Sequence, residues 1–160
     1  MSKFLVLCHP KIILLKDNKL DNHWYSQIIN DIVEELNIEI ASVETVDLLN
    51  GGNMQADCFC NEFYELNRNK YDFIISPDAG GPWYRAHEDL DYDKFLSILK
   101  GILTMTKVGG YILLDKLYVT EFRMFLNQFF EEEHEIVKVK ETFIFGVPRS
   151  AFVLIKKLTE

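Results

Sequence analysis

Residues 71–84 read YDFIISPDAGGPWY and join a short apolar run to a loop with an acid, two glycines and two aromatic residues. The run YDFIIS is nearly continuous in apolar residues, which is typical of a strand buried on both faces of a parallel sheet. Proline and glycines then end the strand. Because a loop in this position follows the carboxyl end of a strand, it is the first candidate for a binding site.

Downstream of this loop, helical and strand patterns alternate. Apolar residues recur at helical spacing over 95–103, and the glycines of KVGG at 107–110 suit a left-handed turn that ends this helix. The next patterns are a strand at 111–117 (YILLDKL), a helix at 120–130 (TEFRMFLNQFF), and strands at 135–145 (EIVKVKETFIF) and 150–158 (SAFVLIKKL). This order predicts an α/β fold with a mostly parallel sheet and a C-terminal antiparallel hairpin.

Upstream of the loop, the patterns are less regular. FLVLC at 4–8 predicts a strand, and IILL at 12–15 is either its hairpin partner or an extended continuation. An amphipathic helix is predicted from about residue 23 to 36, followed by a strand within 38–49. The segment 54–67 fits both a short strand and one face of a helix, so periodicity leaves both open.

Composition favours one intracellular globular domain over residues 1–160. Nearly half of the residues are apolar and 13% are aromatic, which is enough for a buried core. The formal net charge of −8 disfavours nucleic acid and anionic membranes as partners. Three cysteines without metal-type spacing, and an early apolar run too short for a membrane span, lead us to expect a soluble cytoplasmic protein without a metal site.

One local basic patch remains a candidate despite the acidic average. It comprises Lys138, Lys140, Arg149, Lys156 and Lys157. The alternative is that these side chains form the solvated face of the last strands, as alternating lysines commonly do.

From about Val46 onward, the chain resembles the later part of a class I S-adenosylmethionine-dependent methyltransferase. The matching segments are VDLL at 46–49, QADCFC at 55–60, YDFIISPDAGGPW at 71–83 and LTMTKVGGYILLDKL at 103–117. The resemblance implies a single-domain Rossmann-like fold with S-adenosylmethionine (SAM) as cofactor. In such folds, ligands bind outside the carboxyl ends of the parallel strands.

The resemblance also implies roles for particular residues. Asp47, after the second strand, would bind the cofactor ribose, and Asp57, after the third, would face the adenine amino group. The loop after YDFIIS would bring substrate and methyl donor together, with Asp78 as the catalytic residue and with Trp83 and Tyr84 beside the substrate.

Each of these residues also has a structural interpretation. Asp47 fits a turn residue, Asp57 a solvated helix residue, and Asp78 the start of an Asx turn. Trp83 and Tyr84 fit packing against the following helix.

The family's glycine-rich turn after the first strand has no counterpart at 9–22, because the first glycine in the chain is Gly51. Only glycine lets the backbone approach such a cofactor closely. Either the first strand is ASVETVDLL at 41–49, with Asn-Gly-Gly as a reduced cofactor turn that includes Gly51, or the usual site has degenerated.

Two functions therefore follow from the sequence. One is SAM-dependent methyl transfer to a small molecule or a protein group, which relies on positioning more than on an obligatory base. The other is a catalytically inactive methyltransferase-like domain, a pseudoenzyme that binds a protein partner or forms a homodimer.

Overall fold

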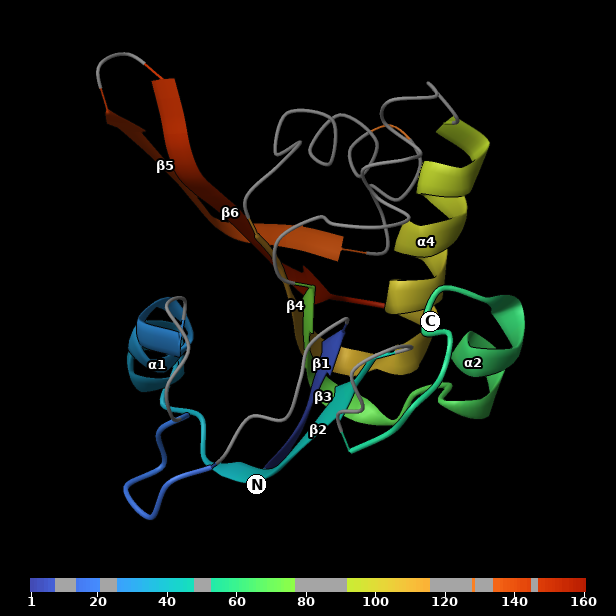
Figure 1. Ribbon diagram of the computed structural model, residues 1–160, viewed down its shortest axis with the longest axis horizontal. Helices are drawn as coiled ribbons and strands as arrows, with labels where there is room; N and C mark the ends of the chain where they lie inside the picture. The colour runs from blue at the N-terminus through green and yellow to red at the C-terminus, as the bar shows by residue number, and fades with distance from the viewer. Residues whose placement is uncertain are drawn as a thin grey trace.

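The computed structural model describes residues 1–7, 14–20, 26–47, 53–76, 92–115, 128, 134–144 and 147–160. Its elements, drawn in Figure 1, are β1 (Ser2–Leu7), α1 (Ser26–Glu35), β2 (Ile40–Val46), α2 (Asn61–Leu66), β3 (Tyr71–Ser76), α4 (Tyr92–Met105), β4 (Thr106–Asp115), β5 (His134–Ile144) and β6 (Val147–Lys157). The helix predicted at 120–130 lies outside the described residues, except for Gln128, which is helical.

The strands form a single sheet in the order β2-β1-β3-β4-β6-β5. Strands β2, β1, β3 and β4 are parallel to one another, whereas β6 runs antiparallel to β4 and β5 antiparallel to β6. This arrangement confirms the predicted mostly parallel sheet with its C-terminal hairpin. The chain builds outward from β1 to β2, then crosses to β3 on the other side, so the switch point lies between β1 and β3.

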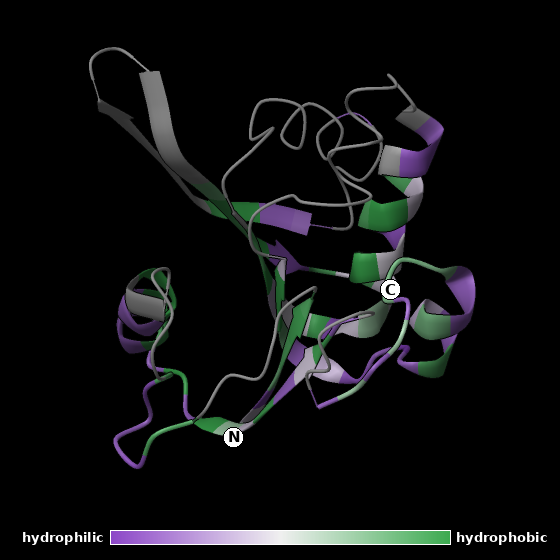
Figure 2. Ribbon diagram, viewed as in Figure 1, coloured by the Kyte–Doolittle hydropathy of each residue, from purple (hydrophilic) through white to green (hydrophobic). Residues whose placement is uncertain are grey.

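Helices cover both faces of the sheet, with α1 on one side and α2 and α4 on the other (Figure 1). Strand β3 shows why, because its side chains alternate between the layers: Phe73 and Ile75 belong to the apolar cluster beneath α1, and Ile74 to the cluster beneath α2 and α4. In Figure 2 the hydrophobic colour gathers on the central strands. The run YDFIIS is therefore a strand buried from both sides.

The structure decides two questions about the first half of the chain. The strand at Ser2–Leu7 is central and Ile40–Val46 lies beside it, so the alternative in which 41–49 is the first strand is wrong. The segment 54–67 is neither one strand nor one helix. Met54 makes a single parallel bridge with Val46, and the helix begins only at Asn61.

The prediction that KVGG ends helix α4 as a glycine turn is wrong. The helix ends at Met105 and Thr106 already begins β4. The glycines belong to a bulge within that strand, where the pairing with β3 is irregular and Gly109 has a φ of 83°. A left-handed residue is needed there, as the glycine suggested, but it bends a strand instead of capping a helix.

Side chains and main chain from distant segments cap α4 in place of glycine. The N–H groups of Asn69 and Lys70 donate to the carbonyls of Thr104 and Met105 at 2.9 and 3.0 Å. The buried Lys157 ammonium donates to the carbonyls of Leu103 and Thr106, both at 2.8 Å. A cation at a helix C-terminus also opposes the helix dipole.

Lys157 therefore does not belong to the basic patch considered from the sequence, because it is 5% exposed and serves the helix end. Lys156 lies over the ring of Tyr111, 6.0 Å from its centroid. The side chains of Lys138, Lys140 and Arg149 lie outside the described ones. Among the residues that the structure describes, no helix is both long and apolar enough to cross a membrane.

Candidate functional site

The carboxyl ends of the four parallel strands meet along one edge of the sheet. Leu7 ends β1 beside Val46 of β2, and Ser76 ends β3 beside Leu114 of β4. The topological switch point lies between Leu7 and Ser76, which is where open α/β sheets bind ligands. This carboxyl edge is the candidate site, and the last residues of β1, β2 and β3 (Leu7, Val46 and Ser76) are buried there.

Two of the predicted site residues fall within the described chain and four do not. Gly51, Asp78, Trp83 and Tyr84 lie outside the described residues, so their roles stay predictions. Asp47 and Asp57 are described, and both follow residues paired at the carboxyl edge.

Asp47 comes immediately after the last residue of β2 and is half-buried. Its N–H donates to the carbonyl of Met54 at 3.1 Å, and the N–H of Met54 donates to the carbonyl of Thr45 at 3.0 Å. These bonds make the parallel bridge between Val46 and Met54. The backbone of Asp47 is therefore fixed at the carboxyl end of β2, next to the switch point.

Asn53 adds three further contacts to this junction, and the sequence did not single it out. Its side-chain Oδ1 accepts the N–H of Thr45 at 2.9 Å and the Thr45 hydroxyl at 3.1 Å. Its own N–H donates to the Thr45 hydroxyl oxygen at 3.0 Å. In the sequence, the only signal was the turn-forming composition of Asn-Gly-Gly-Asn at 50–53, which says nothing of a partner on β2.

Asp57 forms a turn. Its Oδ1 accepts the N–H of Phe59 at 3.0 Å, and its carbonyl accepts the Cys60 thiol at 3.3 Å. The carboxylate is exposed and lies ahead of helix α2, not within it. The interpretation of Asp57 as a solvated helix residue is therefore wrong, whereas its predicted contact with adenine stays a prediction.

The β5–β6 hairpin extends beyond the rest of the sheet at this same edge. Pairing between β4 and β6 stops at Asp115 and Phe152, whereas β5 and β6 remain paired as far as Ile144 and Val147. Figure 1 shows this arm projecting away from the body of the domain. Because β6 is antiparallel to β4, the arm rises past the end at which β4 reaches the candidate site.

A group of polar and charged contacts lies away from the carboxyl edge, near the start of β3. The Tyr71 hydroxyl donates to Glu44 at 2.5 Å, and Lys3 pairs with the same carboxylate at 3.1 Å. Burial, then the Glu44 bond and charge, raises the pKa of Tyr71 far above its usual range. Partial burial raises the pKa of Glu44, but bonds from Tyr71 and Lys3 and the charges of Lys70 and Lys3 lower it overall.

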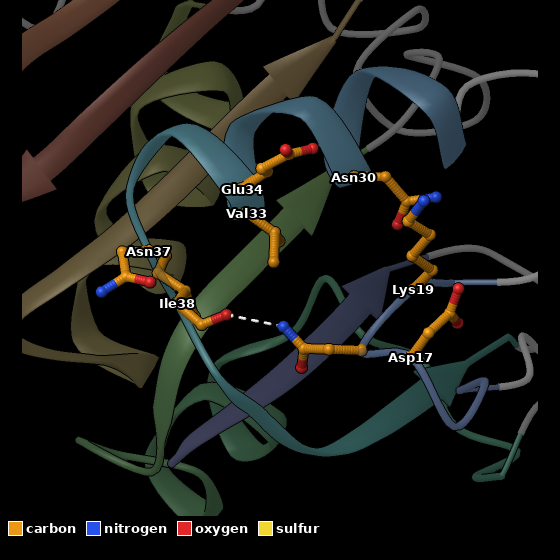
Figure 3. Close-up of a pocket in the computed structure, with 8 residues that line it drawn as sticks. Asp17, Lys19, Asn30, Val33, Glu34, Asn37 and Ile38 are labelled. Carbon is orange, nitrogen blue, oxygen red and sulfur yellow. Dashed lines mark hydrogen bonds between the residues drawn. The ribbon is translucent and has the colours of Figure 1, made fainter.

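A cavity of about 340 Å³ lies beside the other end of β2 (Figure 3). Its lining residues are Asp17, Asn18, Lys19, Asn30, Val33, Glu34, Asn37 and Ile38. Asn18 is already committed, because its amide donates to the carbonyl of Ile38 at 2.8 Å and its Oδ1 accepts the N–H of Ile40 at 2.7 Å. This cavity lies at the amino end of β2 and is separate from the carboxyl edge.

Within the part of the chain that the structure describes, no three His, Cys, Asp or Glu side chains gather as a metal site. No protein-family model and no curated protein matches the chain.

Solved structures with similar folds are methyltransferases. TrmN from Thermus thermophilus is 14% identical with a TM-score of 0.56, and the match covers 98% of this chain but only 44% of TrmN. The N-methyltransferase NodS from Bradyrhizobium japonicum is 9% identical with a TM-score of 0.56, and the coverages are 98% and 86%. A Streptococcus mutans structure in complex with SAH is 12% identical with a TM-score of 0.51 and coverages of 99% and 89%. The chain has a class I methyltransferase-like Rossmann fold.

One part of this methyltransferase-like fold is reduced here. The resemblance led us to expect a strand after β2 that carries Asp57, and the structure has only the bridge at Met54. The side-chain oxygen of Asn53 accepts the N–H of Thr45, which a carbonyl of a neighbouring strand would otherwise accept. At this edge of the sheet, a side chain therefore bonds the main chain of β2, two residues before Asp47.

Proposed function

We propose that this protein is a SAM-dependent methyltransferase that acts on a small molecule or a protein group. The observation that supports this best is the position of Asp47, fixed by its N–H at the carboxyl end of the second strand and beside the switch point. Similar folds occur in methyltransferases, one of them solved with SAH. A carboxylate at this position suits the two hydroxyls of a ribose, because it accepts two hydrogen bonds.

The chemistry requires little of the side chains beyond binding and orientation. When bound, SAM would supply an electrophilic methyl group, which a lone pair of the substrate takes as the bond from methyl to sulfur breaks. Asp47 would hold the ribose hydroxyls, and the buried residues Leu7 and Ser76 end the two strands on either side of the switch point. Positioning of this kind provides most of what in-line transfer needs.

We propose roles at the same carboxyl edge for the remaining residues. Gly51, in the loop that Asp47 begins, and Asp57, beyond Met54, would contact the cofactor. Asp78, Trp83 and Tyr84 follow the end of β3 and would face the substrate.

Calorimetric titration with SAM and with S-adenosylhomocysteine (SAH) tests the proposal. We expect binding in the micromolar range, weakened about tenfold or more in Asp47→Ala, because two hydrogen bonds to a charged acceptor are lost. Asp17→Ala is the matched control, since it removes the same charge from the exposed hairpin at the other end of β2. No heat from the wild-type protein at millimolar ligand would overturn the proposal.

A second function is favoured by the projecting β5–β6 arm, whose outer half pairs only within itself in the described chain. In that role the protein is a pseudoenzyme that presents the arm to a protein partner or to a second copy of itself. Light scattering across a hundredfold range of protein concentration, combined with an absence of SAM binding, would support it. A monomer at every concentration that binds SAM would exclude the homodimer.

A further inference from the structure

We propose that Asn53 is a positioning residue for the cofactor site, which bonds Thr45 and thereby holds the main chain of Asp47 at the carboxyl end of β2. This inference rests on the proposed function, because Asp47 matters only if a cofactor binds there.

The geometry of the loop carries the first step. The chain leaves β2 at Asp47 and returns at Asn53, so seven residues begin and end on neighbouring main-chain positions. Two bonds to Met54 and three to Asn53 hold the two ends together. Three of these five bonds involve the Thr45 hydroxyl or the Asn53 side chain, so side chains make a large part of the closure.

Asn53 is exposed, but the Thr45 groups that it bonds are buried. Thr45 has an exposed fraction of 0%, so in this structure its N–H and hydroxyl depend on Oδ1 of Asn53 and not on solvent. An unsatisfied buried donor costs far more than an exposed bond gains. Thr45 and Asp47 share the strand end, so a shift that recovers a partner for Thr45 would also move Asp47.

Asn53 would affect binding by ordering the main chain at Asp47 before the ligand arrives. With Asn53 in place, the main chain at Asp47 is already ordered, whereas without it that main chain must be ordered when the ligand binds. That ordering cost appears directly as lost affinity. Asn53 touches no cofactor in this account and acts only through Thr45, Met54 and Asp47.

The chain supplies a matched control at the opposite end of the same strand. The Oδ1 atom of Asn18 accepts the N–H of Ile40 at 2.7 Å, just as that of Asn53 accepts the N–H of Thr45 at 2.9 Å. Both asparagines therefore close a main-chain donor of β2, one at the amino end and one at the carboxyl end. Only the second is beside Asp47.

The experiment compares SAH affinity and melting temperature for wild type, Asn53→Ala, Asn53→Asp and Asn18→Ala. We expect both alanine variants to melt at lower temperature, but only Asn53→Ala to raise the Kd for SAH, by about tenfold. Asn53→Asp keeps the Oδ1 acceptor and should stay within about threefold of wild type. Asn18→Ala should stay within about twofold, since it loosens the other end of the strand.

Different outcomes reject different claims. Wild-type protein that binds neither SAM nor SAH overturns the proposed function and this inference together. Binding by wild type that Asn53→Ala leaves unchanged, or that Asn18→Ala weakens equally, overturns the inference and leaves the proposed function standing. If Asn53→Ala does not fold, Thr45→Val replaces it, because this variant removes two of the three side-chain bonds with a group of nearly equal shape. Unchanged affinity in Thr45→Val would also reject the inference.

Discussion

The two ends of the parallel sheet are built for different tasks. At the amino end, side chains bond the main-chain groups. Asn18 Oδ1 accepts the N–H of Ile40, and the Lys157 ammonium donates to carbonyls at the end of α4. At the carboxyl end, β1, β2 and β3 stop at the buried residues Leu7, Val46 and Ser76, and the side chain of Asn53 accepts the N–H of Thr45 near the end of β2. At the amino end the polar groups bond one another and stabilise the fold. At the carboxyl end the strands lead into the loops of the candidate site.

This difference teaches how one fold separates stability from binding. Polar groups that are satisfied internally contribute to stability and have nothing left for a ligand. We therefore expect variants at the amino end to change the free energy of unfolding without changing SAH affinity. The predictions for Lys157 and Tyr71 measure both quantities, because a variant that changed both would break the comparison.

The largest effect is expected for Lys157→Met. The ammonium donates to the carbonyls of Leu103 and Thr106 and, at 3.3 Å, to Asn69 Oδ1, so its loss leaves buried carbonyls unsatisfied. Methionine keeps the apolar stem in place. The free energy of unfolding in urea should fall by about 2–3 kcal/mol, while SAH affinity at 25 °C stays within about twofold.

The adjacent Lys156→Met is the control for charge. Lys156 is half-exposed and lies over the Tyr111 ring, so its loss should cost less than about 1 kcal/mol. Equal effects of the two substitutions would show that the cap on α4 is not what Lys157 contributes.

An intermediate effect is expected for Tyr71→Phe, which removes the bond to Glu44. We expect a loss of about 1–2 kcal/mol near pH 7. Tyr111→Phe, on the neighbouring strand β4, should change stability by less than about 0.5 kcal/mol. SAH affinity should not change, and a weakened site in Tyr71→Phe would mean that the interior of the sheet communicates with its edge.

The pH dependence of stability sharpens this prediction. The pKa of Glu44 is lowered from its ordinary value of 4.5, so its contribution is present above that value and is lost as pH falls through the lower native pKa. The pKa of Tyr71 is raised above its ordinary value of 10.0, so its contribution is present below pH 10 and is lost as pH rises further. Urea titrations from pH 3 to 11 should show both losses in wild type and weaker losses in Tyr71→Phe.

The smallest effect is expected for Lys107→Met. The Lys107 ammonium pairs with Asp72 at 3.2 Å, but its side chain is 45% exposed. Asp72 also keeps a bond at 2.8 Å from the N–H of Lys3. A loss of at most about 0.5 kcal/mol is expected, and it should vanish in 1 M salt. A larger or salt-independent loss would show that this pair is more than a surface contact.

The candidate site was only partly predictable from the sequence. Asp47 was predicted from the resemblance, because it follows a strand pattern whose carboxyl end faces the ligand side of an α/β sheet, and the structure describes it at that strand end. Asn53 was missed because its importance comes from Thr45, eight residues away, and from the loop that brings the two together. The turn made by Asp57 was also missed, since 54–67 fits a strand and a helix equally well and only packing decides between them.

The sequence by itself determined the order of elements, the buried strands and the antiparallel hairpin, because these depend on local periodicity and on apolar runs such as YDFIIS. Only the tertiary structure decided how those elements end. The cap on α4 comes from Asn69, Lys70 and Lys157, up to 54 residues away, and the end of β2 is closed by Asn53 from outside the strand. Local patterns set which segments are buried, whereas a polar group finds its partner only after the chain has folded.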